Sequence, residues 1–352
     1  MQFTKKERRK FNKNSYNSFV LGGDIGGTNT NLGIFGIRKG LPVLLVSFHY
    51  KSNELKGLHW AVNEVLGRAY SDYKLRITKA CFAVAGVLSP DKDYVKVTNA
   101  KWDVSRNVLA EKTNLKKILL INDFEAVGYG ISMLAKKDIA IVKKAKRLPK
   151  APVLVIGAGT GLGKATLAYN EYYDLYIPLP SEAGHSDFAA QSRKELELVN
   201  FIRKRKKIRG SVPYEEVLSG EGLINIYMFL RKSGKFKETM HTKEIAKSDN
   251  KAELISQYRK SNPICKAVFD IFTKIYARFA RNFALDAIAR GGVYIAGGII
   301  AKNSDMLGEE FVKEFENNYT LGHLLKQIPV YAILNYNAGL LGAGFAANKL
   351  LK

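Results

Sequence analysis

The apolar positions in the first third of the chain predict three strands and then an alternation of helix and strand. Short apolar runs separated by turn residues predict a β-meander, apolar positions at helical spacing predict an amphipathic helix, and continuous apolar runs predict buried strands. In chain order, strands are expected at 18–21, 29–37 and 41–50, a helix at 54–70, strands at 79–88 and 117–122, and a helix after Asp123.

The pattern restarts near residue 151. We expect strands at 151–156, 164–169 and 172–178, helices at 193–206, 220–232 and 263–290, strands at 292–296 and 329–334, and a closing helix at 338–350. The basic segments 136–150 and 201–209 are interpreted as exposed loop or helix surface. A strand, glycine loop, strand, strand unit occurs near residue 20 and again near residue 152, which predicts two similar α/β halves with a cleft between them.

The composition is that of a globular protein, because 46% of the 352 residues are apolar and 25% are charged. The two cysteines, Cys81 and Cys265, exclude a disulfide scaffold and a four-thiolate zinc site, and they fit a reducing compartment. No apolar run approaches the roughly 20 residues that span a bilayer. The basic residues at the N-terminus are followed by polar residues and not by the apolar core of a signal peptide. We therefore expect a cytoplasmic protein with no membrane partner.

The formal net charge of +24 permits two interpretations. One is a nucleic-acid-binding protein, whose basic residues neutralise phosphates. The other is a basic but solvated surface, which the even spread of Lys and Arg along the chain favours. We therefore expect that nucleic acid is not a partner.

The first glycine loop, Gly22 to Asn29, combines four glycines with Asp24 and Thr28. Glycines let backbone N–H groups approach an anion closely. A carboxylate beside a phosphate is repulsive unless a cation lies between them, so Asp24 suggests a Mg²⁺ site that faces a nucleotide phosphate. The alternative is an ordinary hairpin turn, in which such glycine pairs are common.

Two further glycine segments lie in the second half. Gly157 to Lys164 matches neither the Walker A spacing nor the dinucleotide fingerprint, so we interpret it as a hairpin in which Thr160 and its neighbours could meet a phosphate. Gly297 and Gly298 follow a buried strand, where adenine or ribose could lie against the backbone; close packing of a helix on the strand is the alternative.

Polar groups that could bind or activate hydroxyl groups of a substrate occur at three places. Asn122 and Asp123 follow an apolar strand, where an Asp could accept a proton from an attacking hydroxyl, or either residue could simply cap a helix. Glu182 and His185 are three apart in a loop and could hold vicinal sugar hydroxyls, although a lone surface histidine is the alternative. Glu215 precedes a glycine-bearing turn and, considered alone, reads as a solvated helix residue.

Taken together, these segments resemble the bacterial-type ATP-dependent glucokinases of the actin/hexokinase/sugar-kinase superfamily. The resemblance runs from about Val20 to about Ala346 and rests on eight segments in the family's order. They are LGGDIGGTNTNLGIF, TNAKWDV, LLINDFEAVGYGI, VIGAGTGLGKATL, LPSEAGHSDFA, EEVLSGEGLINIY, GGVYIAGGII and NAGLLGAG.

The resemblance implies an α/β, two-lobed actin/hexokinase-like (ribonuclease H-like) fold with a cleft between the lobes. The expected parts are a basic N-terminal tail (1–17), a small domain (18–133 plus 335–352) and a large domain (134–334). It further implies transfer of the γ-phosphoryl group of ATP to the 6-hydroxyl of D-glucose, with Mg²⁺ as cofactor and a homodimer as the assembly.

The resemblance also implies residue roles. Asp123 is expected to be the catalytic base, and Asn122, Glu182, His185 and Glu215 complete the expected glucose ligands. The expected nucleotide contacts are Gly23, Asp24, Ile25, Gly26, Gly27, Thr28, Gly159, Thr160, Gly161, Gly297 and Gly298, with Asp24 holding Mg²⁺ through water.

The chain departs from the family pattern at Ser181 and Ala183, where the family often has glycine, and at Glu221, where it often has proline. Small side chains in the sugar loop could shift sugar preference. A kinase for mannose, N-acetylglucosamine or another hexose therefore remains an alternative, as does a non-catalytic nucleic-acid-binding relative, and the loops do not separate ATP from polyphosphate as donor.

Overall fold

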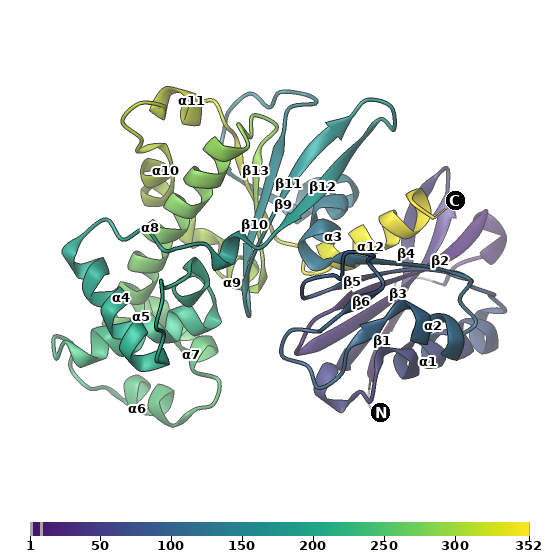
Figure 1. The fold of residues 1–352 in the computed structure, drawn as a ribbon, viewed down its shortest axis with the longest axis horizontal. Coiled ribbons are helices and arrows are strands. Elements are labelled where there is room, and N and C mark those ends of the chain that lie inside the picture. Colours follow the sequence, from purple (N-terminus) through teal and green to yellow (C-terminus); the bar gives the residue numbers. More distant parts are fainter. Residues whose placement is uncertain (1–2, 8–9, 352) are drawn as a thin grey trace. The chain divides into compact units, whose positions relative to one another are not determined.

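The computed structural model describes residues 3–7 and 10–351, and these form two compact units. The first unit comprises residues 1–135, 176–180 and 337–352, and the second comprises 136–175 and 181–336. Each unit is built around its own six-stranded sheet (Figure 1).

The sheet of the first unit has the strand order β1-β4-β3-β2-β5-β8. Strands β2 to β4 form an antiparallel meander, β1 pairs with β4 in antiparallel orientation, and β2, β5 and β8 run parallel. The strands are β1 (Phe3–Glu7), β2 (Ser18–Ile25), β3 (Asn29–Arg38), β4 (Leu41–Lys51), β5 (Lys79–Val84) and β8 (Lys117–Asn122), with a small hairpin of β6 (Tyr94–Val95) and β7 (Val104–Ser105). The helices are α1 (Leu58–Tyr73), α2 (Arg106–Lys112), α3 (Asp123–Gly130) and α12 (Ala338–Lys349).

One face of this sheet carries the apolar core. Leu21, Ile34 and Phe48 are fully buried there and belong to the same cluster as Val62 and Val65 of helix α1. Because side chains alternate along a strand, the intervening residues of β2, β3 and β4 point to the opposite face, on which α12 lies.

Helix α12 packs against the sheet and against α3 by backbone contact (Figure 1). A Cβ atom added at Gly342 would lie 1.7 Å from the carbonyl oxygen of Ala126, and one added at Gly130 would lie 2.2 Å from that of Ala338. One added at Gly22 of β2 would lie 2.9 Å from the backbone nitrogen of Gly344. The separation between these elements is therefore set by the absence of side chains.

The sheet of the second unit has the strand order β12-β11-β10-β13-β14-β9. Its strands are β9 (Ile139–Lys143), β10 (Val153–Ala158), β11 (Leu162–Asn170), β12 (Leu175–Ser181), β13 (Val293–Ala296) and β14 (Val330–Ile333). Its helices are α4 (Arg193–Lys206), α5 (Gly220–Lys232), α6 (Met240–Lys247), α7 (Lys251–Gln257), α8 (Pro263–Asp286), α9 (Gly298–Lys302), α10 (Glu309–Glu316) and α11 (Gly322–Lys326). The long helix α8 contributes Phe272, Tyr276 and Phe279 to the core, each of them fully buried.

The two-unit α/β organisation and the repeated strand, glycine turn, strand, strand order are confirmed. Expectation and structure differ in three places. Residues 3–7 form β1 and pair with β4, although a loose basic tail was expected there. The segment expected as exposed surface at 136–150 contains β9, and Gly22, Gly23 and Asp24 belong to strand β2 and not to a loop.

The glycine contact between α3 and α12 predicts opposite effects for two Gly→Ala changes in helices. Gly67 of α1 has open space around the position of an added Cβ, so Gly67→Ala should stabilise the chain by about 0.5–1 kcal/mol. Gly342→Ala should destabilise it by roughly 1–3 kcal/mol or more, because the new methyl group meets a backbone carbonyl. Both tryptophans, Trp60 and Trp102, lie in the first unit, so urea unfolding followed by tryptophan fluorescence measures both changes. Equal effects of the two substitutions would contradict the close contact.

Candidate functional site

Asn122 and Asp123 lie where strand β8 ends and helix α3 begins. The Asn122 side-chain oxygen accepts hydrogen bonds from the backbone N–H groups of Phe124 (2.9 Å) and Glu125 (3.4 Å), so Asn122 is the N-cap of the helix. Phe124 N–H also donates to Oδ1 of Asp123 at 3.0 Å. The cap and the candidate base are therefore adjacent residues, and the capping interpretation holds for Asn122 alone.

Glu125 completes this helix start, and sequence reasoning missed it. Its carboxylate accepts from the backbone N–H of Asn122 at 3.4 Å, which closes a capping box. The side chain is buried, and burial raises the pKa of Glu125. The signal was present in the sequence as the spacing Asn-x-x-Glu across the predicted strand end.

The first glycine turn follows strand β2 and contains Gly26, Gly27, Thr28 and Asn29. Gly26 N–H donates to the carbonyl oxygen of Asn29 at 2.9 Å. A Cβ atom at Gly27 would lie 2.2 Å from the carbonyl oxygen of Thr98 and 2.9 Å from Cβ of Asn99, so the turn lies close against the loop after β6. A tight turn whose glycines carry no side chain is what close approach to a phosphate requires.

Ser52 holds this turn in place and was also missed. Its hydroxyl donates to the carbonyl oxygen of Gly26 at 2.6 Å and lies 2.9 Å from the hydroxyl of Thr30. Its backbone N–H donates to Thr28 O at 3.0 Å, and its own carbonyl accepts from the indole of Trp102 at 2.8 Å. The side chain is fully buried, and Ser52 joins the turn, strand β3 and the loop that carries Trp102.

Asp24 lies in β2 immediately before the turn, on the face covered by α12. A Cβ atom at Gly339, in the first turn of α12, would lie 3.1 Å from its Oδ2 atom. Burial raises the pKa of Asp24 to about 6, and a hydrogen bond with Asn31 acts in the opposite direction. At neutral pH the carboxylate is therefore largely ionised although its desolvation opposes the charge.

Asp24 and Asp123 lie at the same end of the sheet, where the parallel strands have their carboxyl ends. Strands β2, β5 and β8 run parallel, and Ile25 pairs with Val84, which pairs with Asn122. Open α/β sheets bind ligands at the carboxyl ends of such strands. The register therefore brings the candidate metal-binding carboxylate and the candidate base to one end of the first unit.

In the second unit the other glycine turn joins β10 to β11. Gly159 N–H donates to Gly161 O and Gly159 O accepts from Gly220 N–H, both at 2.8 Å, with Thr160 exposed at the tip. Gly297 adopts φ +96°, and a Cβ there would lie 2.3 Å from the carbonyl oxygen of Ala158. Gly298 begins α9 with open space around it. The backbone N-termini of α5 and α9 thus border the hairpin.

Two short 3₁₀ helices carry the remaining predicted sugar ligands. His185 ends the first, Ala183–His185, and Glu182 directly precedes it, while Glu215 lies in the second, Tyr214–Glu216. Glu182 Oε2 lies 3.8 Å from His185 Nε2, and both side chains are more than half exposed. Glu215 Oε2 accepts from the backbone N–H of Leu162 at 2.7 Å. Glu215 is therefore not a solvated helix residue but a direct contact of the glycine hairpin.

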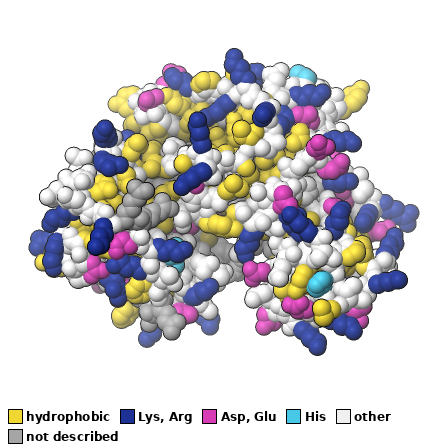
Figure 2. Space-filling model, turned by 180° about the vertical axis from the view of Figure 1, so that it is seen from behind, with side chains coloured by type: hydrophobic (Ala, Val, Ile, Leu, Met, Phe, Trp, Pro, Cys, Tyr) yellow, Lys and Arg dark blue, Asp and Glu magenta, His cyan; other side chains and the backbone are white. Residues whose placement is uncertain are grey.

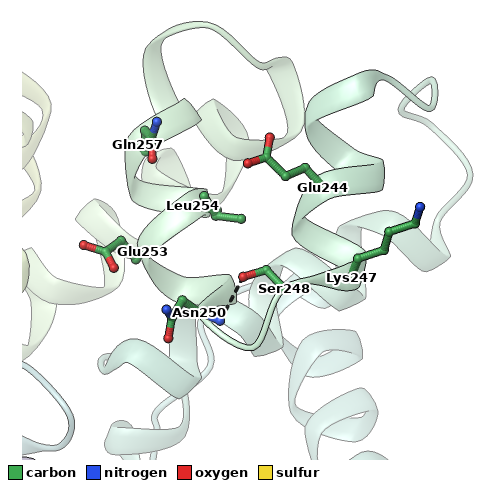
Figure 3. A pocket seen from close by; sticks show the side chains of 7 residues that line it. All are labelled: Glu244, Lys247, Ser248, Asn250, Glu253, Leu254 and Gln257. Carbon is green, nitrogen blue, oxygen red and sulfur yellow. Dashed lines mark hydrogen bonds between the residues drawn. The ribbon is translucent and has the colours of Figure 1, made fainter.

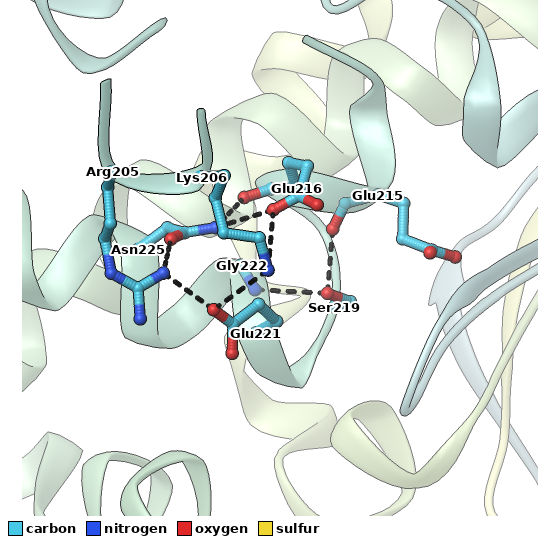
Figure 4. A network of polar contacts seen from close by, with 8 residues as sticks. All are labelled: Arg205, Lys206, Glu215, Glu216, Ser219, Glu221, Gly222 and Asn225. Atoms are coloured by element: carbon cyan, nitrogen blue, oxygen red, sulfur yellow. Dashed lines mark hydrogen bonds and ion pairs between the residues drawn. The ribbon is translucent and has the colours of Figure 1, made fainter. Parts of the chain in front are cut away.

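The backbone of Glu215 and Glu216 is fixed by a polar network (Figure 4). Ser219 donates to the carbonyl oxygen of Glu215 at 2.7 Å, and the buried Asn225 donates to Glu216 O at 2.8 Å. Arg205 donates to Asn225 and to Glu221, the latter at 2.7 Å. In Figure 4 the Glu215 carboxylate points away from this network.

A model of the glucokinase family matches residues 21–350. A glucokinase from Nostoc sp. is 34% identical over 348 residues, which is 95% of this chain and 100% of that protein. A glucokinase from Yersinia enterocolitica is 33% identical over 329 residues, 93% of this chain and 95% of that protein. The chain belongs to the glucokinase family.

Solved structures of similar fold agree with this membership. The glucokinase from an Antarctic psychrotroph superposes with a TM-score of 0.76 at 25% identity, covering 94% of this chain and 98% of that one. A glucokinase from Balamuthia mandrillaris in complex with glucose gives a TM-score of 0.78 at 22% identity, covering 94% and 93%, and supports the fold alone. The actin/hexokinase-like fold class is confirmed.

Membership in the glucokinase family leaves the positive surface without an assigned role. Figure 2 shows Lys and Arg side chains scattered over the visible face and interspersed with Asp and Glu. In the basic run at the end of α4, Arg205 and Lys206 pair with Glu221, at 2.7 and 3.4 Å. Such pairing reduces the charge that this run offers to a polyanion. Among the described residues, no helix is long and apolar enough to cross a membrane.

A separate pocket of about 400 Å³ lies between α6 and α7 (Figure 3). It is lined by Glu244, Lys247, Ser248, Asn250, Glu253, Leu254 and Gln257. None of the predicted site residues lines it. Its two carboxylates and single ammonium group do not match an anionic nucleotide.

The raised pKa of Asp24 predicts a pH-dependent stability change for Asp24→Asn. A carboxyl whose pKa is higher in the folded than in the unfolded chain binds protons more tightly when folded, so its ionisation destabilises the fold as pH rises from about 4 to 6. At pH 7.5 the Asp24→Asn variant should therefore unfold at a higher urea concentration than the parent chain. Its free energy of unfolding should be larger by at most about 3 kcal/mol. The difference should shrink as the pH falls toward 4. Fluorescence-detected unfolding over this range measures it, and a difference independent of pH would show that burial does not act on this carboxyl.

Proposed function

We propose that this chain transfers the γ-phosphoryl group of ATP to the 6-hydroxyl of D-glucose, giving glucose 6-phosphate and ADP. The observation that carries the proposal is the shared sheet edge of the first unit, where Asp123 and Asp24 follow parallel strands in a chain that matches the glucokinase family over residues 21–350. A base for a hydroxyl and a carboxylate for a metal–phosphate group are the two parts that this transfer needs.

In the proposed step, a carboxylate oxygen of Asp123 accepts the proton of the sugar 6-hydroxyl while O6 of the sugar attacks the γ-phosphorus. The O6–P bond forms, the bond from the γ-phosphorus to the β–γ bridging oxygen breaks, and ADP leaves with the electron pair. Position at the first turn of α3 supports this role, because the helix N-terminus stabilises the negative charge of Asp123 before transfer. The capping box of Asn122 and Glu125 fixes the backbone that presents it.

The glucose ring is proposed to be held by Asn122, Glu182, His185 and Glu215. The exposed Glu182–His185 pair offers acceptor and donor atoms 3.8 Å apart, a spacing suited to neighbouring hydroxyls. Glu215 would serve both substrates, since its carboxylate already holds the hairpin that contains Gly159, Thr160 and Gly161.

Mg²⁺ is proposed as the cofactor, with Asp24 as the protein group that would hold it through water. The residues present fit this ion. Asp24 supplies an ionised carboxylate oxygen close to a glycine turn, and Mg²⁺ in nucleotide sites is usually bound by one or two carboxylates and the phosphates. When bound, the ion would neutralise charge on the transferred phosphoryl group. Gly23, Ile25, Gly26, Gly27 and Thr28 would approach the phosphates by backbone contact, and Gly297 and Gly298 would face the adenosine.

The family resemblance further supports a homodimer that works in the cytoplasm. Light scattering of the purified chain tests the oligomeric state directly.

Substitution of the proposed base predicts a loss of turnover without a loss of sugar binding. Asp123→Ala should lower kcat by about two to four orders of magnitude, the usual contribution of a general base. The isosteric Asp123→Asn should show a similar loss, because it keeps the size and removes the basicity. A coupled assay of ADP release gives kcat, and calorimetry gives the glucose affinity. Near-normal turnover of either variant would remove Asp123 from the mechanism.

A panel of acceptors and donors completes this test. Glucose, mannose and N-acetylglucosamine are compared with ATP as donor, and ATP is compared with polyphosphate with glucose as acceptor. The proposal expects the highest kcat/KM for glucose with ATP. A preference for another hexose would change the identity of the substrate and leave the role of Asp123 unchanged.

A further inference from the structure

Three neighbouring strands of the first unit carry a row of polar side chains that begins at Asp24. Asp24 of β2 pairs with Asn31 of β3, and Asn31 pairs with His49 of β4. Directly paired residues point to the same face of a sheet, so these three side chains lie in line. The residue beside His49, Tyr50, points to the opposite face and belongs to the apolar core.

Hydrogen bonds connect the members of this row. His49 Nδ1 lies 2.7 Å from Oδ1 of Asn31, and His49 Nε2 lies 3.2 Å from the hydroxyl of Ser47. Asn31 is also directly paired with Asp24 across β2 and β3, and hydrogen bonding with Asn31 acts to lower the pKa of Asp24. Because an amide oxygen only accepts, His49 must donate from Nδ1, and the hydroxyl of Ser47 can donate to Nε2.

This arrangement fixes the orientation of the Asn31 amide. With its oxygen engaged by His49, its NH₂ group faces the carboxylate of Asp24, which needs a donor. The reversed amide would set an oxygen against the carboxylate and an NH₂ group against the N–H of His49, which is repulsive at both ends. With its proton on Nδ1, His49 therefore favours the same amide orientation that the ionised carboxylate of Asp24 requires. All the side chains involved are buried or half-buried, where an unmatched polar group is costly.

We propose that His49, acting through Asn31, is a positioning residue that holds the Asp24 carboxylate in the orientation needed for binding of the Mg²⁺–nucleotide. This inference rests on the proposed role of Asp24. A carboxylate that accepts one fixed hydrogen bond keeps its remaining oxygen lone pairs in a constant direction, and Asp24 lies in β2 close to the glycine turn. None of the motifs in the sequence indicates His49, because its connection to Asp24 depends on the strand register.

A double-substitution cycle tests the connection. The variants are Asn31→Leu, His49→Leu and the two combined, and the readout is calorimetric binding of a non-hydrolysable ATP analogue as Mg²⁺ is varied. Asn31→Leu should raise the Mg²⁺ concentration for half-maximal binding by about tenfold and His49→Leu by about threefold, as for loss of a hydrogen bond. If His49 acts only through Asn31, the combined variant should match Asn31→Leu. Additive effects of about thirtyfold would overturn the proposal.

Two further variants separate positioning from general destabilisation. Tyr50→Phe changes the neighbouring residue on the other face and should leave the Mg²⁺ dependence unchanged. His49→Gln supplies an amide donor to Asn31 and should restore most of the binding lost in His49→Leu, even if the leucine variant unfolds. A glutamine variant as weak as the leucine variant would overturn the proposal.

The binding measurement needs no turnover, so it stays informative if glucose is not the substrate. Failure of the parent chain to phosphorylate glucose would contradict the proposed function, while Mg²⁺-dependent binding would still report on the row. Binding of the analogue that is independent of Mg²⁺ in the parent chain would contradict the positioning role itself.

Discussion

The contact of α12 with β2 and α3 is the constraint on which the first unit depends. Strand β2 carries Asp24, and α3 begins with Asp123. Both elements touch the same helix through backbone atoms at Gly22, Gly130 and Gly342. Side chains can change rotamer to absorb a small shift, whereas a backbone contact cannot, so the separation of the two carboxylates follows from the fold itself. The chain reaches this arrangement by returning its last helix to the sheet with which it began.

The second unit uses the same principle around a hairpin. Gly159, Gly220 and Gly297 bring three backbone segments together, and the carboxylate of Glu215 holds the N–H of Leu162. A proposed sugar ligand and a proposed phosphate loop are thereby joined by one hydrogen bond. The acidic groups of both units, and not the net charge of +24, carry the chemistry in this account. In this account the positive surface only increases the rate at which anionic ATP encounters the protein.

The sequence predicted the elements with strong periodicity or long apolar runs, including helices α4 and α5 at their observed bounds. It did not predict β1, because Phe3–Glu7 is mostly charged and becomes a strand only by pairing with the edge of β4. Motifs located the candidate residues that follow strands, but tertiary contacts decided their surroundings. Ser52, just after β4, contacts the glycine turn, and the Asn31–His49 pair of β3 and β4 lies beside Asp24. These partners depend on strand register, which local pattern does not specify.

The central claim is that this chain joins the γ-phosphoryl group of ATP to O6 of glucose. The most direct measurement is nuclear magnetic resonance of the product formed from ¹³C-labelled glucose and ATP. The account predicts glucose 6-phosphate, with phosphorus coupling to carbon 6 and stoichiometric ADP. Release of inorganic phosphate without a sugar phosphate, or phosphate on another carbon, would contradict it.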